Sequence, residues 1–315
     1  LRAGRLINLG VAALLAVTGA VLCTSPAAAM SSGDISVGSD VARAGSLIPV
    51  KVTGLHSTPA CRLSVVGPAQ GKAVVVKVRN SEAKARIRLP GTSGIYRVKA
   101  SCGTDGTASS APFVVVGRTS PLAATCEVLE SGFSVDSKHW YVSFGAVVRN
   151  SSPELSATDV EVAFTFKDAA GNVILNYGLR PGDVPPGSTI VAGRTSIVAN
   201  GATSLTVTPR CTTATEKVIP VAPGDGSVYV HPNISFEISI SGQFANPASF
   251  PVSSQAPIGF ILRDPFGHII AGGSGYLDGF IPPGGTGTWH WEEFSWDPAY
   301  GTPASVQSTL RLEAA

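Results

Sequence analysis

After its first 29 residues the chain lacks any apolar run long enough to cross a bilayer, and it lacks a convincing amphipathic helix. The first absence excludes a transmembrane segment from the mature chain. The second leaves an all-β fold as the prediction. Without the first 29 residues the chain has 21 basic and 21 acidic residues. This neutral balance argues against nucleic acid as a partner.

Recognisable catalytic motifs are also missing. None of the five histidines stands in an H-E-x-x-H motif, and no G-x-S-x-G elbow precedes a helix. Asp168 and Asp264 resemble a carboxylate pair, but they occupy equivalent turns of two repeats, where an Asx turn explains them. No C-x-x-C pair is present to hold zinc. We therefore predict a protein that is not an enzyme and that has no cofactor or metal.

The first 29 residues have the pattern of a secretory signal peptide. A short basic stretch precedes a nearly continuous apolar run, residues 6–22, and residues 27–29 are all alanine, which suits signal peptidase. The alternative is a lipoprotein anchor at Cys23, which would require a small residue where Leu22 stands. The prediction is a secreted, extracellular protein, either released or retained at the cell envelope.

Only four cysteines remain after that segment, an even number suited to an oxidising compartment. Three pairings are open, and the domain boundaries favour closure within one domain each. The predicted disulfides are Cys61–Cys102 and Cys126–Cys211.

Glycine and proline are plentiful instead, with 35 and 23 residues. They are spread along the chain and separate short segments rich in valine, isoleucine, threonine and phenylalanine, a pattern typical of β-sandwiches and barrels.

An internal repeat with a period near 96 residues organises the second part of the chain. Residues 142–150 superpose on 238–246 with apolar residues on apolar residues at period two, so both copies present the same face inward. Each of these segments ends in an asparagine, Asn150 or Asn246. A period of this length corresponds to one sandwich domain. In the second copy Ala222 and Ser308 fall near the places of the paired cysteines.

The strand that follows carries a family resemblance. Residues 164–168 (F-T-F-K-D) and 260–264 (F-I-L-R-D) resemble the F-x-L-Y-D signature of the FxLYD domain. That domain is an immunoglobulin-like β-sandwich of prokaryotic secreted and envelope proteins. Lys167 and Arg263 stand where the signature has tyrosine. The resemblance implies fold and location, and it brings no catalytic residues. It covers two copies, at about 126–214 and 222–315.

The first domain is a different sandwich, because Tyr96 and the segment leading to Cys102 resemble the late strand of bacterial immunoglobulin-like domains. We predict three tandem immunoglobulin-like β-sandwich domains after a cleaved signal peptide. The segments are a signal peptide at 1–29, a basic immunoglobulin-like domain at 30–117, an FxLYD-like sandwich at 118–217 and an acidic second FxLYD-like sandwich at 218–315.

Charge is unevenly distributed. Residues 30–117 hold 11 basic and 4 acidic residues, whereas residues 215–315 hold 3 and 9. Basic residues of the first domain recur at period two, which places them on the outer faces of strands. They are either a solvated face that resists aggregation or a surface for anionic wall polymers, lipid headgroups or the acidic domain of a neighbouring copy. The last case would give weak electrostatic self-association. The candidate contacts are Lys77, Arg79, Lys84, Arg86, Arg88, Arg97 and Lys99.

An aromatic cluster lies near the end of the chain. It is either core packing or a platform that stacks on sugar rings or on a partner protein. His290 and Glu292 lie within it, but two ligands are too few for a metal site. The platform residues would be Trp289, Trp291, Trp296 and Tyr300.

The predicted function is that of a non-catalytic interaction or structural protein, secreted or associated with the envelope. Its partner would be an unknown protein or a cell-wall polymer. The alternative is a carbohydrate-binding accessory module that uses the aromatic cluster at 289–300.

Overall fold

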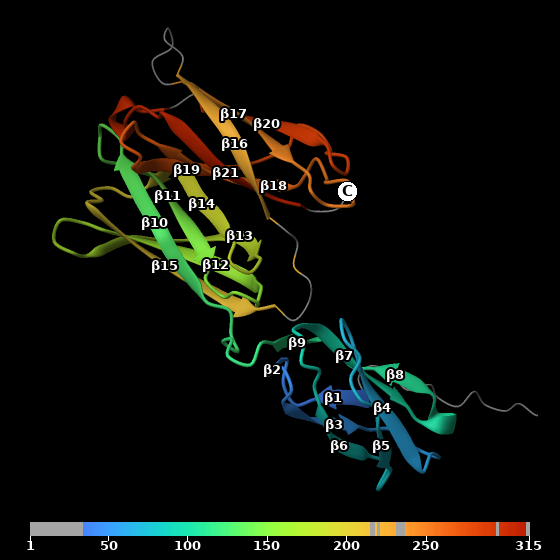
Figure 1. Cartoon of the computed structure of the whole chain (residues 1–315). Coiled ribbons are helices and arrows are strands. Elements are labelled where there is room, and N and C mark those ends of the chain that lie inside the picture. Colours follow the sequence, from blue (N-terminus) through green and yellow to red (C-terminus); the bar gives the residue numbers. More distant parts are fainter. Residues whose placement is uncertain (1–33, 215–217, 219–220, 231–236, 294–295, 313–315) are drawn as a thin grey trace, which may run out of the picture.

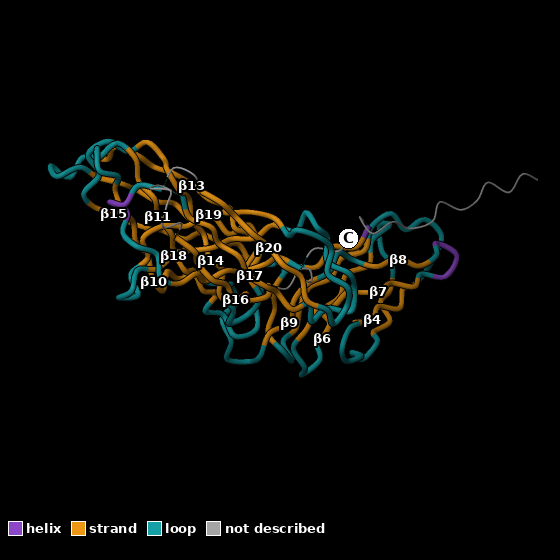
Figure 2. The backbone as a smooth tube through the Cα atoms, turned by 90° about the horizontal axis from the view of Figure 1, so that it is seen from above, coloured by secondary structure: helices purple, strands orange, loops and turns teal. Residues whose placement is uncertain are grey.

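The computed structural model describes residues 34–214, 218, 221–230, 237–293 and 296–312, so the signal peptide predicted at residues 1–29 lies outside the described residues. The described chain folds into three β-sandwiches in a row (Figure 1). Its helical turns are short, as in η2 (Gly103–Asp105) and η3 (Pro298–Tyr300) (Figure 2). The predicted all-β fold class is confirmed. No helix in the described part of the chain is long and apolar enough to cross a membrane.

The first sandwich packs the sheet β1-β3-β6 against the sheet β2-β9-β7-β4-β5, with β8 added beside β7. Its core is built by strict alternation: in β4, Cys61, Leu63 and Val65 are buried while Arg62 is exposed. The strands are β1 (Ile35–Val37), β2 (Val41–Arg43), β3 (Leu47–Val52), β4 (Ala60–Val66), β5 (Val74–Lys77), β6 (Ala83–Arg88), β7 (Gly94–Ser101), β8 (Thr107–Ser109) and β9 (Phe113–Val116).

The second sandwich consists of the sheets β10-β11-β14 and β13-β12-β15. Phe144 of β11 and Phe164 and Phe166 of β12 are fully buried between them. The strands are β10 (Cys126–Val135), β11 (Tyr141–Asn150), β12 (Ala157–Lys167), β13 (Val173–Val184), β14 (Thr189–Val198) and β15 (Ser204–Thr213).

The third sandwich repeats this plan, and its first strand belongs to both sheets. Residues 221–224 of β16 pair with β21, and residues 225–230 pair with β17, so the order runs β19-β18-β21-β16-β17-β20. The strands are β16 (Val221–Val230), β17 (Ile238–Ala245), β18 (Pro257–Arg263), β19 (Ile269–Tyr276), β20 (Thr286–Glu293) and β21 (Ser305–Arg311).

The second and third sandwiches pack sheet against sheet. Strand β11 is buried along nearly its whole length, because one face lines its own core and the other meets β18 and β19. The backbone N–H of Val191 donates to Oγ1 of Thr309, at 3.3 Å, across this interface. A small apolar cluster fills it, formed by Val147, Val191, Ile261 and Ile269.

Glycines allow the two backbones to approach closely. A Cβ atom added to Gly193 of β14 would lie 2.6 Å from the Cα atom of Gly272 of β19, closer than real Cβ contacts come. A Cβ atom on Gly145 of β11 would lie 2.6 Å from Cγ2 of Ile261. The interface therefore depends on the absence of side chains at these positions.

The first sandwich is tied to the second at the linker. Val114 and Val116 of β9 belong to the core of the second sandwich. Nη1 of Arg43 donates to the carbonyl oxygens of Arg118 and Ser120, at 2.8 and 2.7 Å. These bonds fix the start of the linker on the first sandwich.

Candidate functional site

The asparagines that the two repeats share have the same structural role. Asn150 and Asn246 are buried, at 0% and 1% exposure. Nδ2 of Asn150 donates to three carbonyl oxygens, of Leu155, Val184 and Pro185, at 2.7–3.2 Å. Each asparagine thereby holds the Pro-Pro-Gly turn against the strand end.

Asn246 reproduces these bonds in the second copy. Its Nδ2 donates to the carbonyl oxygens of Phe250, Ile281 and Pro282, at 2.9, 3.1 and 3.1 Å. Its Oδ1 accepts the backbone N–H of Ala248, at 2.9 Å.

The aspartates of the signature are turn residues in both repeats. Oδ1 of Asp168 accepts the backbone N–H groups of Ala170 and Asn172, at 2.9 and 2.8 Å. Oδ1 of Asp264 accepts those of Phe266 and His268, at 2.9 and 2.8 Å. The side-chain amide of Asn172, together with the backbone donors, lowers the pKa of Asp168 below its ordinary value. Both carboxylates stabilise turns, as the sequence predicts.

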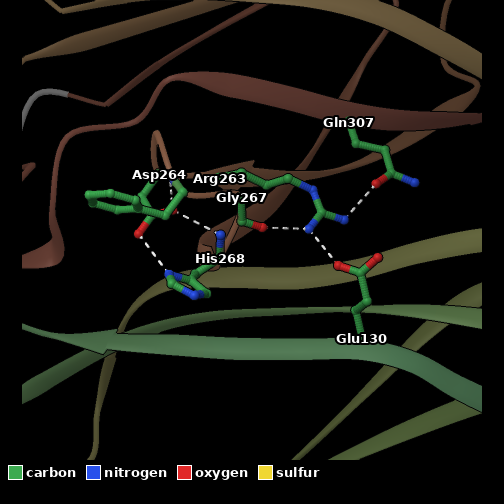
Figure 3. A network of polar contacts seen from close by, with 7 residues as sticks. Glu130, Arg263, Asp264, Gly267, His268 and Gln307 are labelled. Carbon is green, nitrogen blue, oxygen red and sulfur yellow. Dashed lines mark hydrogen bonds and ion pairs between the residues drawn. The ribbon is translucent and has the colours of Figure 1, made fainter.

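The position where the signature has tyrosine joins two domains in the second copy. Nη1 of Arg263 donates to Oε2 of Glu130 on β10 of the second sandwich, at 2.5 Å, and to the carbonyl oxygen of Gly267, at 2.9 Å. Its Nη2 donates to Oε1 of Gln307, at 3.0 Å (Figure 3). The arginine therefore stabilises the packing of the two sandwiches.

Both predicted disulfides are confirmed. Cys61 and Cys102 close a span of 41 residues in the first sandwich, and Cys126 and Cys211 close one of 85 in the second. In the second copy the equivalent of Cys211 is not Ser308, because Phe164 pairs with Val207 whereas Phe260 pairs with Ser308. Counted from these pairs, the equivalent residue is Leu312, which is buried in one cluster with Ala222.

The aromatic cluster is core packing, so the platform interpretation is wrong for most of its members. The ring of Trp289 stacks between Phe244 and Phe260, with centroids at 6.3 and 5.5 Å. Trp296 and Tyr300 pack on each other. The period-two alternation of β20 turns its tryptophans inward and His290 and Glu292 outward. The exposures of Trp289, Trp296 and Tyr300 are 1%, 4% and 3%, and Trp291 is half-buried.

The candidate basic residues do not form one surface, because they lie on two different sheets of the first sandwich. Lys84, Arg86 and Arg88 of β6 are exposed on the sheet β1-β3-β6. Lys77, Arg97 and Lys99 are exposed on β5 and β7, on the opposite side of the sandwich, and Arg79 lies beyond the end of β5.

The two basic faces, one on β6 and one on β4, β5 and β7, differ in the acidic side chains beside them. Glu82 lies with the β6 face, where its carboxylate pairs with Lys51 and Lys84, at 2.6 and 2.8 Å. The hydrogen bond from Lys51, followed by that from Lys84, lowers the pKa of Glu82. The β4-β5-β7 face has no acidic side chain on these three strands.

A groove crosses this uncompensated face. It has a volume of about 430 Å³, and the segment around Gly71 forms its wall, held by the bond from the N–H of Gly71 to the carbonyl oxygen of Val65, at 3.1 Å. Its lining combines two cations with hydroxyl and amide groups: Arg62, Lys99, Ser64, Ser101, Thr107 and Gln70. Sequence reasoning missed Arg62, although its alternation with Cys61 and Leu63 marks it as outward-facing.

The cleft between the second and third sandwiches is less suited to a ligand. It has a volume of about 220 Å³ and is lined mainly by backbone, glycine and apolar side chains. Typical small-molecule sites occupy roughly 300–1,000 Å³. Across the described residues no three histidine, cysteine, aspartate or glutamate side chains gather where they could hold a metal ion.

Comparison with known proteins gives no family. No family model and no curated protein match the sequence. The chain is similar to the crystal structure of Salmonella alpha-2-macroglobulin reacted with methylamine, with 11% identity and a TM-score of 0.26, over 89% of this chain and 23% of that one. The chain is also similar to Escherichia coli alpha-2-macroglobulin activated by porcine elastase, with 10% identity and a TM-score of 0.27. This match covers 89% of this chain and 30% of that one. The chain spans less than a third of the length of either protein.

Proposed function

We propose that the protein is a non-catalytic, secreted interaction protein whose basic first domain contacts the partner. The observation that carries this proposal is how the polar side chains are used. In the repeats the buried asparagines and the turn aspartates form hydrogen bonds that stabilise turns. These residues are Asn150, Asn246, Asp168 and Asp264. In the first domain the cations of the β4-β5-β7 face are exposed, and none of these three strands carries an acidic residue. The repeats therefore act as a support, and the first domain as the contact surface.

An extracellular location fits the two disulfides, which persist in oxidising compartments. We further propose that the two repeats are FxLYD-type domains and that the chain is retained at the cell envelope by a protein or a wall polymer. We do not propose the sugar-stacking alternative, because Trp289, Trp296 and Tyr300, three of the four rings that it requires, are buried in the core.

Fractionation of the cells that make the protein tests this proposal. We expect the chain in the medium or the envelope fraction, with Cys61, Cys102, Cys126 and Cys211 protected from alkylating reagents. A wash at about 1 M salt should release the envelope-bound part, because the Debye length then falls to about 3 Å. A chain found in the cytosol with reactive thiols would overturn the proposal, as would turnover of envelope substrates by the purified protein.

A further inference from the structure

We propose that the groove on the β4-β5-β7 face of the first domain binds a linear anionic polysaccharide, a glycan chain that carries carboxylate, sulfate or phosphate groups. This inference rests on the proposed function, because it names the ligand class of the surface assigned there.

The first argument is the arrangement of the cations. Arg62 of β4 pairs with Ser101 of β7, and Ser64 pairs with Lys99. Arg62 and Lys99 are therefore diagonal neighbours on adjacent strands, which are typically about 7–8 Å apart, with Cβ atoms somewhat closer. Both side chains are exposed, and no carboxylate lines the groove to neutralise them. Two fixed cations at this spacing suit successive anionic groups of one chain.

The second argument is the chemistry between the cations. Ser64, Ser101, Thr107 and Gln70 line the same groove, and each side chain both donates and accepts hydrogen bonds. A glycan presents hydroxyl groups beside its charges, so it would use both kinds of group. A phosphate or carboxylate alone would use only the donors.

The shape of the surface argues against a lipid bilayer. A bilayer presents its charges in one plane, whereas the basic residues of this domain lie on opposite sheets, with Arg86 on β6 and Lys99 on β7. The groove is a recess beside the segment of Gln70 and Gly71, and a recess accommodates a narrow chain better than a flat membrane.

A second copy of this chain is a less suitable occupant, because several carboxylates of its acidic third domain already have partners. Asp264 and Asp278 of the acidic third domain already bind His268 and His290, at 3.1 and 2.7 Å. Asp297 accepts hydrogen bonds from Ser137, at 2.8 and 3.1 Å. These carboxylates would have to leave existing partners to reach the groove.

The test uses the full chain and three soluble polymers: dextran sulfate, alginate and neutral dextran. We expect the wild type to bind the two anionic polymers and not dextran, with affinity falling between about 0.01 and 0.15 M salt as the Debye length shortens from about 30 to about 8 Å. The double substitution of Arg62→Gln with Lys99→Gln should weaken binding at least tenfold, because charge-assisted hydrogen bonds are lost. The matched pair Lys84→Gln with Arg86→Gln, on the opposite face, should change it less than twofold.

A second variant separates a glycan groove from plain charge attraction. Ser64→Ala with Ser101→Ala keeps every charge, and we expect a loss of affinity of about threefold or more. Thermal unfolding of each variant, followed by circular dichroism, checks that the fold is intact.

Three outcomes would overturn the inference. The first is equal weakening by the two charge-removing pairs. The second is no binding to either anionic polymer at about 0.01 M salt. The third is equally tight, Arg62-dependent binding to phosphatidylglycerol vesicles, which would make the ligand a membrane. Each leaves the proposed secretion and the proposed lack of catalysis standing, because cell fractionation and turnover assays test those two parts separately.

Discussion

Single buried asparagines organise each repeat. The uncharged side chain of Asn246 connects two separate loops. Its amide group donates hydrogen bonds to the carbonyl oxygens of Phe250 and Ile281. Buried carbonyl groups without a donor are costly, so one side chain decides whether both loops can close over the core.

We predict that Asn246→Ala destabilises the third domain by about 2–4 kcal/mol, because buried carbonyl groups lose their donors. Urea unfolding followed by tryptophan fluorescence measures this, since three of the four tryptophans lie in the third domain. The control is Asn176→Ala, at an exposed position of β13. Similar losses in both variants would contradict the role given to Asn246.

At the scale of strands, the two repeats differ at the positions of the Cys126–Cys211 disulfide. In the second sandwich a disulfide joins Cys126 of β10 to Cys211 of β15. In the third, Ala222 and Leu312 occupy the equivalent places and are buried in the same core. In the third sandwich the two strands are also paired directly through their backbones, at residues 221–224 of β16.

This equivalence predicts how the disulfide can be replaced. Removing it with Cys126→Ser and Cys211→Ser should cost about 3–5 kcal/mol of stability. Cys126→Ala with Cys211→Leu copies the third sandwich, and it should retain about 1 kcal/mol more than the serine pair because position 211 is half-buried and a leucine there covers apolar surface. Chemical denaturation of both variants under reducing conditions measures the difference. If the serine pair is as stable as the Ala/Leu pair, the two sites are not equivalent.

At the scale of the whole molecule, two sandwiches pack sheet against sheet and the first sandwich is joined at the linker. The second and third sandwiches share the apolar cluster around Val191 and the bond from Arg263 to Glu130, so they pack together as one unit. The first sandwich is joined through β9 and the linker bonds of Arg43. The β7 residues that line its groove are Lys99 and Ser101, whereas β9 pairs with residues 94–96 at the other end of β7.

We predict that Gly272→Ala loosens the contact between the second and third sandwiches. Its Cβ atom would lie 2.8 Å from the Cα atom of Gly193 and 2.9 Å from the carbonyl oxygen of Phe144, so one backbone must move. The expected loss is about 1–3 kcal/mol. Hydrogen exchange should rise in both β14 and β19, which belong to different domains.

Gly275→Ala is the matched control on the same strand, because a Cβ atom there meets nothing within 4 Å. It should change stability by less than about 0.5 kcal/mol. Faster exchange confined to β19 in Gly272→Ala would show that the two sandwiches do not stabilise each other.

Much of the fold follows from local pattern in the sequence. Period-two alternation determines which side chains of β4, β7 and β20 point inward, since successive side chains of a strand lie on opposite faces. The same rule predicts the exposure of Lys84 and Lys99. The repeat aligns Asn150 with Asn246. Each of the first two domains contains two cysteines, and this predicts both disulfides.

Only the tertiary structure decided which faces meet. Alternation says that Trp289 and Trp291 share a face, but the partner sheet decides that this face is the core. The residues of β6 and β7 are alike in sequence, but sheet order places Arg86 and Lys99 on opposite sides of the sandwich. The contact that buries the outer face of β11 joins residues more than one hundred positions apart, such as Gly145 of β11 and Ile261 of β18. The sequence therefore determined the strands and their inward faces, because these depend on neighbouring residues. Sheet order and domain packing depend on residues far apart in the sequence. The tertiary structure therefore determined where the groove and its cations lie.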